Sequence, residues 1–342
     1  MFLLKLVFLF LFVTILSWGL IARLIGVLKQ RDIVDRPNDR TLHLGAVPRG
    51  AGLVIILCLV VSLLYAAVSS GRIAFFVSLA ALVIAWASLS WLDDKHDLSA
   101  RYRLLVQLVF CLCTVAAFGW VNRVNGLELA YVGAIISLVG VLWMANLYNF
   151  MDGLDGLAGA QTVIASSTLS FWFYISGDTP LAIVCLVLAA SSYGFILHNW
   201  SPAKIFMGDV GSITIGAFFG TLIIIGSTRH GISVLSFINL FAVFIVDASF
   251  TIIRRALKRE KIWLAHNQHL YQRLAKAGYS HSSIALSAAI LMALCSVLAT
   301  LSVAYHDMIK LSILGVISSL LIAILLVIWL EKKAQATKQT LK

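Results

Sequence analysis

Long apolar segments dominate this chain and decide what it can fold into. A helix needs about 17 to 25 mostly apolar residues to cross a bilayer, and eleven runs of roughly that length are present. They cover residues 2–28, 53–69, 73–92, 104–120, 129–147, 157–175, 181–197, 213–227, 232–253, 284–305 and 311–330. With 61% hydrophobic and 12% charged residues, the chain is too apolar for a soluble core. The sequence therefore predicts an all-α, polytopic membrane bundle of about eleven transmembrane helices.

Basic residues lie mostly in one set of alternate loops. Twenty Lys and Arg residues fall in the loops and tail on one side, and five fall on the other. Because Lys and Arg favour the cytoplasmic side, we expect a periplasmic N-terminus and a cytoplasmic C-terminus. The net charge of +11 then follows from topology and attraction to anionic lipid, and we expect no nucleic-acid partner. We expect one membrane domain over residues 1–330 and a basic cytoplasmic tail over 331–342.

Acidic residues are concentrated on the same predicted inner side. That side holds 12 of the 15 Asp and Glu residues, counting Asp247 at the inner end of its span. Transporters usually place ionisable groups near the bilayer midplane, which here is nearly free of charge. A transporter or lipid scramblase would rely on Asp247, but this residue lies seven positions before Arg254, two helical turns away on one face, and a structural bridge between the two is the simpler explanation. The inner segment 254–283 is expected to form a short helix or hairpin over the inner surface.

The first polar cluster contains Asp93, Asp94 and Asp97 at the inner end of the third apolar run. Three carboxylates within five residues produce a strong negative field, which suits a divalent cation or a general base. A solvated helix end with a pair between Asp and Lys95 is the alternative interpretation.

The second cluster joins the fifth and sixth runs. Asn146 and Asn149 are followed by two Asp-Gly pairs at Asp152 and Asp155. Glycine lets the backbone turn tightly beside a ligand, and amide and carboxylate oxygens suit magnesium, ribose or uracil. A plain turn needs only one Asp-Gly pair, so this spacing favours a binding site.

The third cluster precedes the eighth run, which is the shortest and contains Gly216, Gly220 and Gly226. Lys204 is the cation of this loop and is suited to a phosphate, and Asp209 opens the next helix. A metal-bound diphosphate can approach the backbone amides at such a helix start. A helix cap is the alternative for Asp209.

The fourth cluster lies in the long basic inner loop and contains His266, His269 and Arg273. Two histidines three positions apart face one side of a helix and suit a diphosphate or sugar. A zinc site would need further ligands, and no neighbouring Cys or carboxylate supplies them. A solvated surface helix is the other alternative.

Taken together, the four clusters resemble the polyprenyl-phosphate N-acetylhexosamine-1-phosphate transferases of glycosyltransferase family 4. This family includes phospho-N-acetylmuramoyl-pentapeptide transferase and the enzymes that start O-antigen synthesis. The resemblance runs from about residue 30 to residue 275, in the same order. It also includes the first inner loop, with Asp35-Arg36-Pro37-Asn38, Arg40, His43, Pro48, Arg49 and Gly50.

The resemblance implies a role for each matching residue. Asp93 is similar to the family's proposed base, with Asp94 and Asp97 in support. Asp209 and Asn149 are similar to its ligands for Mg²⁺, or alternatively Mn²⁺. The remaining matches imply contacts to nucleotide, diphosphate and sugar: Asn146, Asp152, Asp155, Lys204, Phe206, His266, His269, Arg273 and Arg49.

The resemblance also implies the partners and the location. The expected substrates are a UDP-N-acetyl amino sugar and undecaprenyl phosphate, in contact with membrane lipid, and a homodimer is compatible with the sequence. The expected location is the bacterial inner membrane, with the active site facing the cytoplasm. Here the histidine motif reads His266-Asn267-Gln268-His269, unlike the muramoyl-pentapeptide and N-acetylglucosamine branches. It is more similar to the O-antigen branch that uses 6-deoxy sugars.

One further enzyme class has a related motif. Intramembrane aspartyl proteases use Gly-x-Gly-Asp, and Phe206-Met207-Gly208-Asp209 differs from it at the first position. The partner carboxylate would have to face Asp209 inside the membrane, whereas Asp93 and Asp94 lie at a membrane edge. This interpretation is the weakest of those considered.

Overall fold

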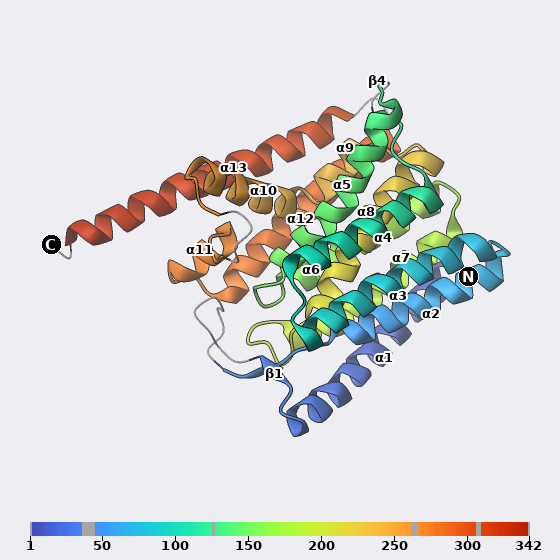
Figure 1. Ribbon diagram of the computed structural model, residues 1–342, viewed down its shortest axis with the longest axis horizontal. Helices are drawn as coiled ribbons and strands as arrows, with labels where there is room; N and C mark the ends of the chain where they lie inside the picture. The colour runs from blue at the N-terminus through green and yellow to red at the C-terminus, as the bar shows by residue number, and fades with distance from the viewer. Residues whose placement is uncertain (1, 36–44, 125–126, 262–265, 306–308, 341–342) are drawn as a thin grey trace.

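The chain is described here from a computed structural model, which covers residues 2–35, 45–124, 127–261, 266–305 and 309–340 (Figure 1). Its helices are α1 (Phe2–Gln30), α2 (Gly52–Ser70), α3 (Ile73–His96), α4 (Ala100–Phe118), α5 (Ala130–Phe150), α6 (Leu157–Ile175), α7 (Thr179–Asn199), α8 (Asp209–His230), α9 (Val234–Leu240), α10 (Ala242–Leu257), α11 (Leu270–Lys276), α12 (His281–Ala304) and α13 (Ile309–Thr340). Two short hairpins pair β1 (Val34–Asp35) with β2 (Val47–Pro48), and β3 (Arg123–Val124) with β4 (Leu127–Glu128). The predicted all-α class is confirmed.

Each predicted span corresponds to observed helix. Among the described residues, nine helices are long and apolar enough to cross a membrane, and a bent pair makes up to ten. That pair is α9 and α10, which meet at 81° where one span was expected. Helix α6 is not among the nine, but it covers the expected range 157–175. It contains buried polar side chains such as Gln161 and Thr162, and Thr162 shares a 2.6 Å hydrogen bond with the Tyr148 hydroxyl.

Helix α8 is the most buried of the nine candidate spans, with 83% of its apolar window inside the bundle. Its glycines make this possible because they permit close helix contact. A Cβ atom at Gly216 would lie 2.4 Å from the Met144 carbonyl oxygen, and one at Gly220 would lie 2.9 Å from Val141 Cα, both on α5. The glycines that shorten the apolar run in the sequence are therefore positions where α8 packs against α5.

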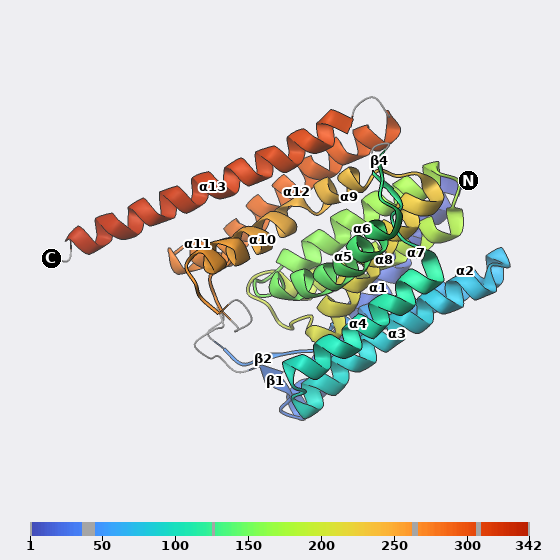
Figure 2. The same cartoon turned by 45° about the horizontal axis from the view of Figure 1, so that its top comes forward.

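The two ends of the chain lie at opposite ends of the bundle (Figure 1). The four clusters all lie toward the end where α13 finishes, beside β1 and α11. Helices α12 and α13 form a layer on one side of α5–α8, and α2–α4 lie on the other side (Figure 2). Which end faces the cytoplasm stays a prediction.

An ion-pair network closes the opposite end of the bundle. Asp178 caps α7 by accepting a 3.1 Å hydrogen bond from the Leu181 amide. It also accepts 2.8 Å hydrogen bonds from Arg72 at both carboxylate oxygens and lies 3.3 Å from His230 Nε2. Burial opposes ionisation, but bonds from His230 and Arg72 hold the pKa of Asp178 at about 2. The network connects the starts of α3 and α7 to the end of α8.

Candidate active site

Arg49 lies at the centre of a cluster of carboxylates. Its guanidinium pairs with Asp209, the first residue of α8, and lies 3.5 Å from the Asp94 carboxylate at the end of α3. The Asn149 amide, from the end of α5, lies 2.9 Å from the same Asp209 oxygen. Burial alone would lower the pKa of Arg49, but the charges of Asp209 and Asp94 raise it. Asp94, Asn149 and Asp209, which belong to three clusters far apart in sequence, therefore lie together around Arg49.

Backbone pairing between two loops places Arg49 beside α8. Phe206 N donates to Pro48 O at 2.8 Å, and Gly50 N donates to Phe206 O at 3.0 Å. Just beyond, Gly52 on α2 touches Gly211 on α8, where an added Cβ would lie 2.4 Å from the Gly211 Cα. No side chain larger than hydrogen fits this crossing, so glycine here determines how close Arg49 comes to Asp209.

Asp152 joins the cluster from the α5–α6 loop. Its carboxylate accepts a hydrogen bond from the Gly208 backbone amide, next to Asp209. Loss of hydration and the charge of Asp209, opposed by Arg49, together raise the pKa of Asp152 to about 8. The cluster is therefore rich in oxygen ligands and short of positive charge.

The Asp pair at the end of α3 divides into two environments. Asp93 is buried, accepting a 2.6 Å hydrogen bond from Arg103 and a 3.1 Å bond from the Leu98 amide. One carboxylate oxygen thus holds α3 to α4, and the other holds the connection between them. Asp94 faces Arg49, whereas Asp97 is exposed and ends α3 with a left-handed φ of 49°. The structure brings Asp94, rather than Asp93 or Asp97, into contact with the Arg49 cluster.

The residues expected to bind the nucleotide make contacts in separate parts of this end of the bundle. Asn146 lies one turn before Asn149 and donates to Gln107 Oε1 at 3.2 Å. Asp155 is buried, accepts a 3.2 Å bond from the Ala203 amide and lies 3.4 Å from His281 Nδ1 at the start of α12. Lys204 is exposed, and Phe206 is half-buried beside Arg49. Asp155 thus ties the α5–α6 loop to the α7–α8 loop.

A carboxylate that the sequence interpretation did not assign to the site holds residues 266–273, here called the histidine segment, in place. Buried Asp247 on α10 accepts bonds from the backbone amides of Leu270 at 2.8 Å and Tyr271 at 3.2 Å. It also lies 3.2 Å from Nδ1 of His269 and receives a 3.3 Å bond from the Thr251 hydroxyl. An acidic residue inside an apolar span was the available signal, but the sequence indicated only a local contact with Arg254.

The other residues of the histidine segment lie next to these contacts of Asp247, which we call the Asp247 clamp. The imidazole centroids of His266 and His269 are 4.9 Å apart. Burial, together with the nearby His269 and Arg255, lowers the pKa of His266 to about 4. Arg273 lies on α11, and the neighbouring Tyr271 hydroxyl donates to Phe150 O at 2.9 Å. This bond joins the histidine segment to the end of α5.

Part of the first inner loop falls outside the described residues. The expected residues Arg36, Pro37, Asn38, Arg40 and His43 belong to that part, whereas Asp35, Pro48 and Gly50 are described.

Comparison with known proteins gives the family. The model for "Glycosyl transferase family 4" matches residues 75–227. A relative from Bacillus subtilis, a "Probable undecaprenyl-phosphate N-acetylglucosaminyl 1-phosphate transferase", is 32% identical over 256 residues, covering 72% of this chain and 71% of the relative.

Two further relatives agree with this family. The Escherichia coli K12 "Undecaprenyl-phosphate alpha-N-acetylglucosaminyl 1-phosphate transferase" is 27% identical over 289 residues, with 78% of this chain and 76% of the relative covered. The "Phospho-N-acetylmuramoyl-pentapeptide-transferase" of Synechococcus elongatus is 31% identical over 214 residues, with 56% and 57% covered. With its apolar helices and these relatives, the chain belongs to the membrane enzymes of glycosyl transferase family 4.

Proposed function

We propose that this enzyme transfers an N-acetylated amino-sugar 1-phosphate from a UDP-sugar to undecaprenyl phosphate. The products would be undecaprenyl-diphospho-sugar and UMP. The observation that carries the proposal is the convergence of Arg49, Asn149 and Asp209, from three distant loops, at the start of α8. A helix start with adjacent cationic and oxygen-bearing side chains suits a diphosphate and its metal. The names of the relatives contain undecaprenyl phosphate and an N-acetylglucosaminyl 1-phosphate group, and the family resemblance implies UDP as the carrier of the sugar.

The reaction is a phosphoryl substitution. An oxygen of the lipid phosphate attacks the β-phosphorus of the UDP-sugar, and the bond from this phosphorus to the bridging oxygen breaks. UMP leaves with the bridging oxygen and its electron pair. A phosphate monoester has a second pKa near 6, so the acceptor is mostly dianionic at neutral pH and needs little help from a base. The larger requirement is therefore positive charge beside the diphosphate, which Arg49 and a bound divalent cation would supply together.

The chain's own residues would divide this work. Arg49 is charged and lies beside Asp209, so it is placed to bind phosphate oxygens when the substrate displaces a carboxylate. His269 is held by Asp247, and Arg273 lies on α11 just after it. These two side chains would bind the diphosphate or the sugar. Asn146, Asp152, Asp155, Lys204 and Phe206 would surround the nucleotide.

Mg²⁺, or alternatively Mn²⁺, fits the donor set of the cluster. Among the residues that the structure describes, no three His, Cys, Asp or Glu side chains are arranged as a metal site. Mg²⁺ is usually held by one or two carboxylates together with substrate phosphates, and Asp209 and Asn149 provide such hard oxygen donors. The ion would neutralise negative charge on the diphosphate.

The sugar and the location complete the proposal. Two relatives carry N-acetylglucosamine in their names, whereas the motif His266-Asn267-Gln268-His269 resembles the O-antigen branch that uses 6-deoxy sugars such as N-acetylfucosamine or N-acetylquinovosamine. The product would begin a cell-surface glycan such as O-antigen. The excess of Lys and Arg near the cluster end supports a site facing the cytoplasm across the bacterial inner membrane.

The deciding experiment is UMP release by purified protein. Protein, undecaprenyl phosphate, Mg²⁺ and a panel of UDP-sugars should yield UMP with at least one sugar, and a chelator should stop it. Asp209→Asn should remove nearly all of this release, whereas Cys185→Ser, at a buried position of α7, should change it little. A fully active Asp209→Asn would refute the metal role. A transporter or scramblase would release no UMP with any sugar.

A further inference from the structure

One ionisable pair connects the α5–α6 loop, residues 151–156, to the start of α12. Asp155 of this loop is buried, and its Oδ2 lies 3.4 Å from Nδ1 of His281, the first residue of α12. Only 10% of the Asp155 side chain and 19% of the His281 side chain are exposed. His281 belongs to none of the four polar clusters and lies beyond residue 227, where the family match ends. The contact with Asp155 is therefore the evidence for its role.

The same carboxylate oxygen also contacts the α7–α8 loop. The Ala203 amide donates to Asp155 Oδ2 at 3.2 Å. The next residue of the α5–α6 loop, Gly156, donates from its amide to the Asn199 side chain at 2.9 Å. His281 thus brings α12 to a point where two loops already meet.

The pair favours the ionised form of Asp155. Burial would raise the pKa of Asp155, because a carboxylate loses hydration there. The hydrogen bond and the charge of His281 are the largest influences in the opposite direction, and the pKa of Asp155 lies below its usual value. The Ala203 amide and the Ser201 hydroxyl add smaller effects in the same direction. Among the described residues, His281 is the one basic side chain paired with Asp155, so without it a buried charge would keep only neutral donors.

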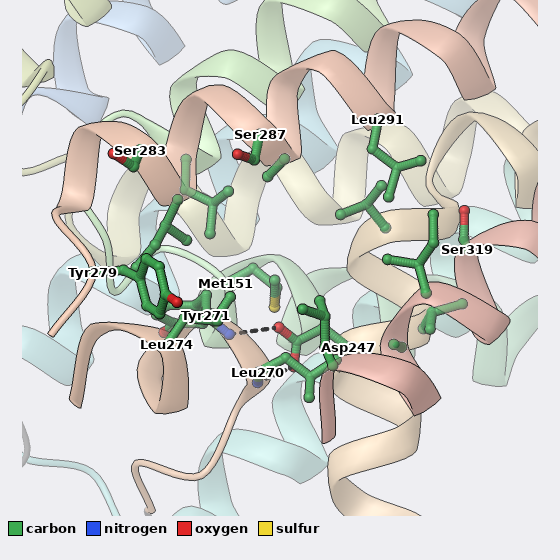
Figure 3. Close-up of a pocket in the computed structure, with 18 of the residues that line it drawn as sticks. Met151, Asp247, Leu270, Tyr271, Leu274, Tyr279, Ser283, Ser287, Leu291 and Ser319 are labelled. Carbon is green, nitrogen blue, oxygen red and sulfur yellow. Dashed lines mark hydrogen bonds between the residues drawn. The ribbon is translucent and has the colours of Figure 1, made fainter. Parts of the chain in front are cut away.

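Apolar packing places α12 beside the same loop. Met151, at the start of the loop, and Leu157, just after it, line an apolar pocket together with Ser283 of α12 (Figure 3). The first turn of α12 is capped by Ser280, whose hydroxyl accepts a 3.2 Å hydrogen bond from the Ser283 amide. The start of α12 is therefore an ordered support for the loop, and His281 is its polar contact.

We infer that His281 is a positioning residue for the sugar nucleotide, acting through Asp155 and the α5–α6 loop. The inference rests on the proposed function, in which Asp152 and Asp155 surround the nucleotide. Asp152, three residues before Asp155, keeps its own contact at the start of α8. Loss of His281 therefore loosens one end of the loop and lowers the affinity for the nucleotide, while the contacts at the start of α8 stay in place.

Binding of UDP to the purified full-length protein, measured by titration calorimetry in detergent, tests this role without turnover. His281→Ala removes the contact and should weaken UDP binding by about tenfold, the loss expected for a hydrogen bond to a charged group. His281→Asn and His281→Gln separate position from polarity, because the shorter amide places its nitrogen near Nδ1 and the longer one near Nε2. His281→Asn should recover most of the affinity, and His281→Gln should bind UDP as weakly as His281→Ala.

Steady-state kinetics should show the same order in one parameter. KM for the UDP-sugar should rise by about tenfold in His281→Ala and His281→Gln, while KM for undecaprenyl phosphate and kcat stay unchanged. Ser280→Ala removes the cap of α12 and leaves His281 in place, so it should lower thermal stability and keep the parental UDP affinity. In an Asp155→Asn background, His281→Ala should cause little further loss, because the two substitutions remove one shared contact.

Three results would overturn the inference. One is parental UDP affinity in both His281→Ala and His281→Gln, and another is an equal loss in His281→Asn and His281→Gln. The third is a full further loss from His281→Ala in the Asp155→Asn background, which would mean that the two residues act independently.

The same measurements separate this inference from the proposed function. UDP affinity that falls in His281→Ala and recovers in His281→Asn, in a protein that releases no UMP with any sugar, would reject the proposed transfer and keep the role of His281. UMP release together with parental UDP affinity in His281→Ala and His281→Gln would do the reverse. A parent protein that neither binds UDP nor releases UMP would reject both.

Discussion

Removing the Asp247 carboxylate should uncouple the histidine segment from the membrane bundle. Asp247→Ala leaves the Leu270 and Tyr271 amides and the His269 imidazole without the acceptor that now holds them. The donors are buried, so water does not replace the acceptor without some opening of the segment. We therefore expect the region around α11 to open and the enzyme to lose activity while α10 stays folded.

The magnitude follows from the number of lost partners. A buried donor left unsatisfied costs about 1–3 kcal/mol, and three such donors cost about 3 kcal/mol even at the lower limit. If the histidine segment must be in place at the transition state, a destabilisation of about 3 kcal/mol lowers kcat/KM by roughly a hundredfold. Asp247→Asn keeps one carbonyl acceptor and should lose about tenfold. Thr251→Ala removes only the 3.3 Å bond and should lose about twofold.

The assay combines steady-state UMP release with hydrogen exchange at the Leu270 and Tyr271 amides. Loss of protection at these two amides should increase from Thr251→Ala through Asp247→Asn to Asp247→Ala, in the same order as the loss of kcat/KM. An Asp247→Ala enzyme with parental kcat/KM and protected amides would refute the clamp. Open amides with full activity would show that the histidine segment takes no part in catalysis.

Other predictions concern the cation, the glycine contact and the far end of the bundle. Arg49→Lys keeps the charge but loses the fork that spans two carboxylates, so kcat/KM should fall by about tenfold or more although Asp209 is intact. Gly52→Ala forces a Cβ atom to within 2.4 Å of Gly211 Cα, and the resulting overpacking should lower thermal stability in detergent by about 1–3 kcal/mol. Asp178→Ala should cost about 2 kcal/mol of stability at neutral pH. Because the folded-state pKa of Asp178 is depressed to about 2, this stabilisation is present above the usual Asp pKa and is lost as the pH falls toward 2.

Each of these variants has a matched control. Arg101→Lys changes an exposed residue of α4 and should leave kcat/KM unchanged. Gly140→Ala adds a Cβ with no atom within 4 Å and should not lower stability. Glu128→Gln removes an exposed ion pair with Arg123 and should change stability by less than about 1 kcal/mol. A variant that behaves like its control contradicts the role assigned to the site residue.

Hydropathy predicted the helices well because bilayer thickness fixes their length. All eleven apolar runs coincide with observed helix, including 157–175 as α6. The sequence could not predict the bend between α9 and α10, since no proline or glycine marks Phe241. The run 213–227 extends to Asp209–His230, because its glycines are contact positions and not helix ends. The short helix expected within 254–283 is confirmed as α11.

The candidate site was only partly predictable. Residue type at the ends of the spans was enough to select Asn149 and Asp209, since oxygen-rich loops on one face of a bundle tend to share a ligand, whereas Arg49 was selected only through the family resemblance. Their pairing was not predictable, because Arg49 and Asp209 are 160 residues apart. Asp93 and Asp94 are chemically equal in sequence, and only the direction of α3 turns one toward Arg103 and the other toward Arg49. The roles inferred for these residues stay predictions.

Helix α10 contributes residues to two parts of the molecule, the histidine segment and an apolar pocket. On it, Asp247 fixes the histidine segment, and Val243 and Val246 form a wall of an apolar pocket between α10, α11, α12 and α13 (Figure 3). A shift of α10 would therefore move both the pocket wall and the histidine segment. Thermodynamic linkage then requires a ligand of the pocket and a ligand of the histidine segment to change each other's affinity by the same factor. The 81° break before α10 sets this half-span at a steep angle to α9, and mutual dependence of the two affinities would be the signature of such coupling.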